Sequence, residues 1–131
     1  MFWNKGKQWS KFVTIDRLET IFDKGPSESS LFYHNFMKKY YFIIINPYTD
    51  YIALRLADQL TGPWTEEIHI YQIPYPWNKS PVFAYAGKSH PELQQSENEI
   101  IVTFMSNAGL KDIETMTQVY IPQAIRVTIT K

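Results

Sequence analysis

The stretch YYFIIINPYTDYIALRLA, residues 40–57, decides the fold class. Residues 40–45 are all aromatic or β-branched, which is typical of a strand buried on both faces. Residues 46–50 form a polar turn marked by proline. Residues 51–57 then alternate, with the larger apolar side chains on one face of a second strand. The stretch therefore predicts neighbouring strands of a sheet.

Similar patterns recur along the rest of the chain. Short apolar, aromatic or β-branched runs alternate with turns rich in glycine, proline and polar residues. No segment keeps a helical period, so we predict an all-β fold of antiparallel sheets. The other strand candidates are residues 12–15, 19–22, 31–34, 68–71, 84–87, 99–105 and 124–130.

An internal repeat relates two parts of the chain. The first unit is SSLFYHNFMKKYYFIIIN, residues 29–46, and the second is KSHPELQQSENEIIVTFMSN, residues 88–107. Each has a strand ending near a histidine, a polar turn, an apolar strand and a terminal asparagine. The units lie roughly 60 residues apart, which fits successive four-stranded blades of a β-propeller.

The composition narrows the classes of function. Lys and Arg together number 13, as do Asp and Glu, and this zero net charge argues against a nucleic-acid partner. The absence of Cys excludes disulfides, thiolate metal sites and cysteine nucleophiles. The chain shows no signal peptide and no apolar run of membrane-helix length. We therefore expect no membrane partner, and either a cytoplasmic protein or a processed secreted form.

Five segments in order resemble a known group of proteins. Together they resemble the C-terminal blades of five-bladed β-propellers, among them glycoside hydrolase family 43 and related uncharacterised bacterial families. The resemblance covers about residues 50–131 well and 1–50 loosely. The segments are LRLADQLTGPWT at 54–65, HIYQIP at 69–74, AYAGKSHPEL at 84–93, EIIVTFMSN at 99–107 and VYIPQAIRVTI at 119–129.

The resemblance implies an incomplete propeller of about two to three blades within one domain. Residues 1–30 would end a preceding blade, residues 31–80 would form one blade and residues 81–131 the final blade. In the family-43 enzymes the catalytic carboxylates lie on earlier blades, so the resemblance leads us to expect no catalytic carboxylates among these 131 residues. Gln123 also stands where relatives often carry an arginine. The resemblance therefore implies a glycosidase-like or carbohydrate-binding segment that supplies part of a sugar site and is not catalytically complete alone.

An incomplete propeller would expose apolar sheet faces. The chain could be a truncated piece without activity of its own, it could associate with itself, or it could dock onto a partner chain that supplies the missing blades. The alternative function is thus a non-enzymatic interaction or oligomerisation module. We expect a carbohydrate partner under the first interpretation, and no cofactor under either.

The candidate site residues gather around His90-Pro91-Glu92. His90 and Tyr85 would face the central channel of a propeller, where His90 would bind a sugar hydroxyl or carry a proton. The structural alternative is a histidine that ties its strand to a neighbouring blade. Glu92 is a weak candidate for a general acid, because it needs burial to raise its pKa and has no clearly paired second acid.

Aromatic residues make up 16% of the chain. Trp77 lies in a proline-rich loop and is a candidate platform for a sugar ring. Trp64 belongs to a Gly-Pro-Trp turn and is better explained as a plug that packs the turn against the sheet. Trp3 and Trp9 could either stack on sugars or cover an apolar face.

Metal binding is not predicted. His34, His69 and His90 lack the spacing of metal ligands. His69 falls on a predicted outer strand, and Asp112 and Glu114 fall on a loop, where we expect them to be solvated.

Overall fold

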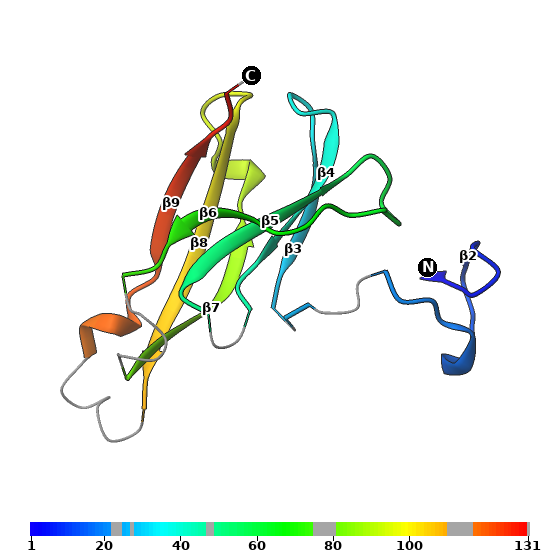
Figure 1. Cartoon of the computed structure of the whole chain (residues 1–131), viewed down its shortest axis with the longest axis horizontal. Helices are drawn as coiled ribbons and strands as arrows, with labels where there is room; N and C mark the ends of the chain where they lie inside the picture. The colour runs from blue at the N-terminus through cyan, green and yellow to red at the C-terminus, as the bar shows by residue number, and fades with distance from the viewer. Residues whose placement is uncertain (22–24, 27, 47–48, 75–80, 110–116, 131) are drawn as a thin grey trace.

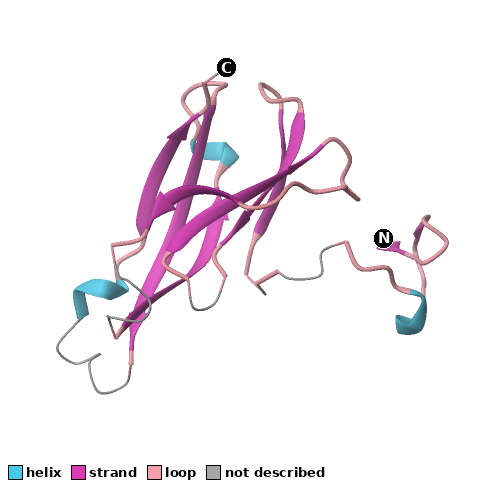
Figure 2. Cartoon of the chain, in the orientation of Figure 1, coloured by secondary structure: helices cyan, strands magenta, loops and turns pink. Residues whose placement is uncertain are grey.

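The computed structural model describes residues 1–21, 25–26, 28–46, 49–74, 81–109 and 117–130. These residues form three antiparallel sheets and three short 3₁₀ helices, with no α-helix among them (Figure 2). The all-β prediction is confirmed. In this part of the chain no helix is long and apolar enough to cross a membrane.

The first large sheet, sheet 1, has four strands that follow one another in chain order. Each pairs antiparallel with the next, so the sheet is a simple meander. The predictions for residues 31–34, 40–45, 51–57 and 68–71 are thereby confirmed to within a residue or two. The strands are β3 (Ser30–His34), β4 (Lys39–Ile44), β5 (Tyr51–Ala57) and β6 (Ile68–Gln72).

Sheet 2 is a second antiparallel meander, built from three strands. The strands are β7 (Val82–Ser89), β8 (Glu99–Ala108) and β9 (Gln123–Thr128), with the 3₁₀ helices η2 (Pro91–Leu93) and η3 (Thr117–Tyr120) in the connections. The prediction of four strands per sheet is right for sheet 1 and wrong for sheet 2. The sequence offers only three strand-length apolar runs after residue 80, and the described residues there form only these three strands.

The N-terminal residues form a small hairpin that lies to one side of the two large sheets (Figure 1). It consists of β1 (Phe2–Trp3), β2 (Trp9–Ser10) and the 3₁₀ helix η1 (Ile15–Arg17). The predicted strand at 12–15 is wrong, because residues 12–14 are irregular and Ile15 opens η1. The predicted strand at 19–22 is also wrong for its described residues, 19–21. Phe12 and Ile15 are 89% and 86% exposed, so no neighbouring strand covers this apolar run.

Sheets 1 and 2 pack face to face around one apolar core (Figure 1). The alternating pattern of β5 and the long apolar runs of β4 and β8 supply it. Ile125 and Val127 of β9, with Ile129 just after the strand, form the predicted row at its edge. Its buried members are Tyr41, Ile43, Ile45, Ile52, Leu54 and Ile73 from sheet 1 and its following turn, and Ile100, Val102 and Phe104 from sheet 2.

A bulge in β7 brings the two sheets into close contact. The β7–β8 register shifts between Tyr85 and Lys88, where Ala86 has a positive φ of 54°. Gly87 follows, and a Cβ built on it would lie 2.8 Å from Cγ1 of Ile45. A methyl group at residue 87 would therefore have to displace the Ile45 side chain, which explains the glycine at this point.

Three hydrogen bonds also join the sheets. The Tyr41 hydroxyl lies 2.7 Å from the Ser89 hydroxyl, and the Ser89 amide donates to Oγ of Ser30 at 2.7 Å. His34 Nε2 donates to the carbonyl oxygen of Glu99 at 3.0 Å. These bonds satisfy polar groups that the packing removes from water.

The opposite face of sheet 1 carries a smaller apolar cluster that Trp64 covers. The buried members of this cluster are Phe42, Ile44 and Ala53. The Trp64 ring packs against them and lies edge-on to Phe42, with ring centroids 6.2 Å apart. Trp64 is therefore a plug that packs its turn against the sheet, as predicted.

Replacement of Gly87 by alanine tests the close contact. We expect Gly87→Ala to lower the free energy of unfolding by about 1–3 kcal/mol, because the new methyl group must displace Ile45 in a filled core. Denaturant unfolding measures this. Gly25→Ala is the matched control, since its Cβ would lie 3.9 Å from Phe42, an ordinary contact. Equal stability of the two variants would contradict the packing described.

Candidate functional site

The face of sheet 2 that points away from the core brings the candidate residues together. In an antiparallel pair, residues opposite each other share a face. Tyr85 is opposite Met105, and Lys88 is opposite Thr103. These residues lie on the face opposite to Val102 and Phe104, whose side chains are in the core. We call this face, with Phe83, Tyr85, Lys88, Thr103, Met105 and Asn107, the open face of sheet 2.

His90 stands at the end of β7 and is held at three points. Its backbone amide donates to the Ile101 carbonyl at 2.8 Å, which continues the pairing with β8. Its Nδ1 lies 2.7 Å from Oε1 of Glu92. Its Nε2 lies 2.7 Å from Oγ1 of Thr103, so the ring turns toward the open face. The imidazole is thus fixed between a carboxylate and a hydroxyl, with 29% of its side chain exposed.

The local sequence explains this arrangement. Pro91 follows His90 and begins η2, where its fixed φ suits the first position of a helical turn. The turn brings Glu92 back toward the His90 ring. The pKa of Glu92 is lowered, first by a hydrogen bond from its own backbone amide and then by the bond from His90. Glu92 is therefore a carboxylate near neutral pH and accepts a hydrogen bond from Nδ1–H of His90.

This geometry fixes the tautomer of neutral His90. Because an ionised carboxylate only accepts hydrogen bonds, Nδ1 must carry the proton. Nε2 is then an acceptor, and the Thr103 hydroxyl donates a hydrogen bond to it. The order is carboxylate, imidazole, hydroxyl, which we call the Glu92–His90–Thr103 chain.

An aromatic group lies farther along the open face. The rings of Phe83 and Tyr85 have centroids 5.9 Å apart. The pKa of Tyr85 is raised, first by burial and then by the neighbouring Tyr120 hydroxyl, which also accepts a hydrogen bond from Asn107 at 3.2 Å. Thr103 and Met105 are two residues apart on one face, a spacing of roughly 7 Å, so Tyr85 is a diagonal neighbour of Thr103.

The described histidines do not converge. His34 is buried between the sheets, and His69 lies on the edge strand β6, stacked on Tyr51 at 3.6 Å. The structural alternative for His90 was a histidine that ties its strand to a neighbouring sheet. His34 has that role, because it binds the Glu99 carbonyl of the other sheet. Among the described residues no group of three His, Asp or Glu side chains could hold a metal ion.

The structure does not bring every candidate residue into this site. Trp77, Asp112 and Glu114 lie outside the described residues. Glu92 is 66% exposed and its pKa is lowered, whereas a general acid needs a raised pKa, so that role stays a prediction requiring burial by a further surface. Thr103 was missed by sequence reasoning. The alternation of β8 places Thr103 on the face opposite to its core neighbours, but its pairing with His90 also depends on the bulge in β7, which the sequence pattern does not show.

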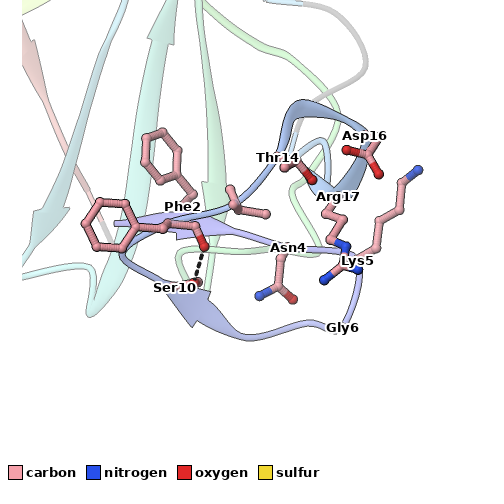
Figure 3. A pocket seen from close by; sticks show the side chains of 10 residues that line it. Phe2, Asn4, Lys5, Gly6, Ser10, Thr14, Asp16 and Arg17 are labelled. Carbon is pink, nitrogen blue, oxygen red and sulfur yellow. Dashed lines mark hydrogen bonds between the residues drawn. The ribbon is translucent and has the colours of Figure 1, made fainter.

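The N-terminal hairpin encloses an open hollow of about 1240 Å³ (Figure 3). Asn4, Lys5, Asp16 and Arg17 line it beside the exposed rings of Phe2 and Phe12. The two tryptophans of the hairpin pack on each other, with centroids 5.3 Å apart. No lining residue is buried, and charged side chains alternate with exposed rings, so the hollow is an open surface without the fixed hydrogen bonds found at His90.

The fold and the site define a class: an all-β protein of packed antiparallel meanders that carries a carboxylate–histidine–hydroxyl chain on an exposed sheet face. Residues 1–128 match the family described as "Domain of unknown function (DUF5005)", and the chain belongs to that family. A search of curated proteins finds no match.

One similar solved structure is described as "a putative hydrolase from Bacteroides ovatus". The TM-score is 0.67 at 16% sequence identity, and the alignment covers 96% of this chain. This similarity shows that the two proteins share a fold over the aligned residues. The present chain spans 34% of the length of that protein, about a third.

The carboxylate of Glu99 closes the turn between β7 and β8 and gives a pH test. Its pKa is lowered, first by the hydrogen bond from the Gln95 amide at 3.1 Å, with a smaller contribution from Arg126. A lowered folded pKa stabilises the protein above the unfolded value of about 4.3, and this stabilisation is lost as pH falls through the folded pKa. We expect wild type to melt above Glu99→Gln at about pH 7 and the difference to shrink toward pH 3. A difference that is independent of pH would contradict this role.

Proposed function

We propose that the two large sheets are successive blades of a β-propeller, with residues 31–80 as one blade, 81–131 as the next and 1–30 as the end of a preceding blade. Both sheets are meanders in chain order, as blades are. Their first strands, β3 and β7, are linked by the Ser89–Ser30 hydrogen bond, as expected for inner strands that meet at a channel. The similar structure, about three times as long, leaves room for further blades.

We further propose that the open face of sheet 2 forms one wall of a carbohydrate site in a hydrolase-like protein. Carbohydrate sites combine aromatic surfaces with fixed polar groups, because sugar rings have both apolar faces and many hydroxyls. Tyr85 supplies the aromatic surface, and His90 with Thr103 supplies the fixed polar groups. Trp77 is a candidate for a second aromatic contact. The observation that carries this proposal is the fixed Glu92–His90–Thr103 chain beside Tyr85.

The proposed role of His90 is to bind a sugar hydroxyl and exchange a proton with it. The Glu92 carboxylate stabilises the imidazolium form and orients the ring. The acids that cleave a glycosidic bond would come from other blades, since that chemistry usually needs two carboxylates flanking the bond. The chain alone would bind sugar without cleaving its glycosidic bonds.

Binding measurements test the carbohydrate proposal. We expect Tyr85→Ala and His90→Ala each to weaken the Kd of the full chain for oligosaccharides by about tenfold, because each removes a direct contact worth about 1.4 kcal/mol. Isothermal titration against a panel of plant and bacterial glycans provides the measurement. His69→Ala is the matched control, since His69 lies on the edge of the other sheet. Unchanged affinity in both site variants, or no glycan bound by wild type, would overturn the proposal.

A second candidate is an interaction or oligomerisation module. The observation that favours it is the exposed apolar surface of the N-terminal hairpin, where Met1 is 79%, Phe12 89% and Ile15 86% exposed. Exposed patches of this kind mark interfaces. This candidate predicts a defined oligomer in light scattering that Phe12→Ser and Ile15→Ser together dissociate. A stable, monodisperse monomer in light scattering would argue against it.

A further inference from the structure

We propose that Thr103 is the nucleophile of a carboxyl-ester hydrolase site, activated by His90 and Glu92, with O-acylated sugars as the substrate class. The inference rests on the proposed function, because it uses the same face and the same class of ligand. It differs in the bond attacked, which is an ester on a sugar hydroxyl instead of a glycosidic bond. It needs no acid from another blade.

The order of the three groups carries the inference. Glu92 Oε1, His90 Nδ1, His90 Nε2 and Thr103 Oγ1 follow one another with two contacts of 2.7 Å. A hydroxyl nucleophile needs a base on its oxygen and a third group that orients the base, and the distances of such hydrogen bonds are about 2.6–3.2 Å. The tautomer derived above leaves the Nε2 lone pair directed at the Thr103 hydroxyl proton. All three groups come from one β7–β8 hairpin, so the geometry does not depend on another part of the chain.

The surroundings of His90 and Thr103 also favour a chemical role for these two residues over a purely structural one. The backbone of His90 is already held by Ile101, so the hairpin does not need the side-chain bonds for its pairing. The His90 side chain is 29% exposed, and Thr103 is half-buried on the open face, so both can meet a ligand. By contrast His34 uses both ring nitrogens within the core, where it is buried. The same residue type is thus structural at one site and exposed to ligand at the other.

The reaction has two balanced steps. Thr103 Oγ1 attacks the ester carbonyl carbon while its proton passes to His90 Nε2, and the C–O bond to the sugar breaks as the sugar oxygen takes that proton. The products are a free sugar hydroxyl and an acyl ester on Thr103. Water then attacks this ester, giving one proton to Nε2, and the carboxylic acid leaves as Oγ1 regains a proton. The steps involve no change of oxidation state, and the Glu92 carboxylate stabilises the imidazolium in both of them.

The position of Tyr85 indicates a sugar ester as the substrate. Tyr85 is a diagonal neighbour of Thr103 on the open face, so its ring can contact a sugar whose acylated hydroxyl reaches Oγ1. Thr103 is half-buried on an open sheet face, and this favours a short acyl group such as acetyl. An alkoxide also leaves more readily than an amine, so an ester suits this exposed site better than an amide.

The test uses the full chain with p-nitrophenyl acetate and with acetylated xylo-oligosaccharides, and follows released p-nitrophenol or acetate. We expect Thr103→Val and His90→Gln to lower kcat/KM at least about 100-fold, and Glu92→Gln about tenfold. Thr128→Val is the matched control, because Thr128 lies opposite Glu99 on the same face of the sheet and outside the Glu92–His90–Thr103 chain. It should keep its rate within about twofold. Diethyl p-nitrophenyl phosphate should label Thr103 in wild type and not in His90→Gln, as read by peptide mass spectrometry.

The outcomes separate this inference from the proposed function. Glycan binding with ester hydrolysis that depends on Thr103 supports both. Glycan binding with no hydrolysis, or with hydrolysis equal in wild type and Thr103→Val, overturns the ester inference and leaves the carbohydrate site. If hydrolysis depends on Thr103 but no glycan binds, the Glu92–His90–Thr103 chain is catalytic and the assignment of a sugar substrate is overturned. Melting temperatures near that of wild type establish that the variants are folded.

Discussion

The close packing of sheet 1 on sheet 2 is the constraint on which the rest of the structure depends. Gly87 marks a point of close approach, where β7 lies against Ile45, the residue that follows β4. The bulge at residues 86 and 87 permits this approach and also shifts the register of β7. Beyond the bulge, Lys88 lies opposite Thr103 and His90 reaches the same face. The bulge that fits β7 against the core therefore also sets where the Glu92–His90–Thr103 chain forms.

Two histidines show how the same packing separates structure from function. His34 and His90 occupy matching places in the two repeat units, each at the end of the first strand of its unit. His34 turns toward the core and binds the Glu99 carbonyl, while His90 turns to the open face and binds Thr103. The opposite directions follow from the different registers of β3–β4 and β7–β8. Similar sequence positions therefore make different contacts, His34 holding the two sheets together and His90 bonding to Thr103 on the open face.

Much of the fold could be predicted from the sequence, because alternation and apolar runs directly reflect which strand faces are buried. Residues 40–57 and 99–105 show this. The pattern failed at residues 12–15, where apolar side chains lie exposed on the N-terminal hairpin. Of the site, His90, Tyr85 and Glu92 were singled out, but Thr103 was not, since its partnership with His90 depends on a bulge that alternation does not reveal. The lowered pKa of Glu92 likewise depends on the η2 turn, which only the structure supplies.

The protonation of the His90 ring nitrogens tests the central claim most directly. Long-range ¹H–¹⁵N spectra of ¹⁵N-histidine protein at about pH 8, above the ordinary histidine pKa, distinguish the two neutral tautomers. The Glu92–His90–Thr103 chain requires a proton on Nδ1 of His90 and a bare Nε2. His34 provides an internal reference, because its Nδ1 accepts the Met37 amide and its Nε2 carries the proton. The predicted spectrum shows opposite tautomers for the two residues. A proton on Nε2 of His90, or rapid averaging between tautomers, would contradict the account.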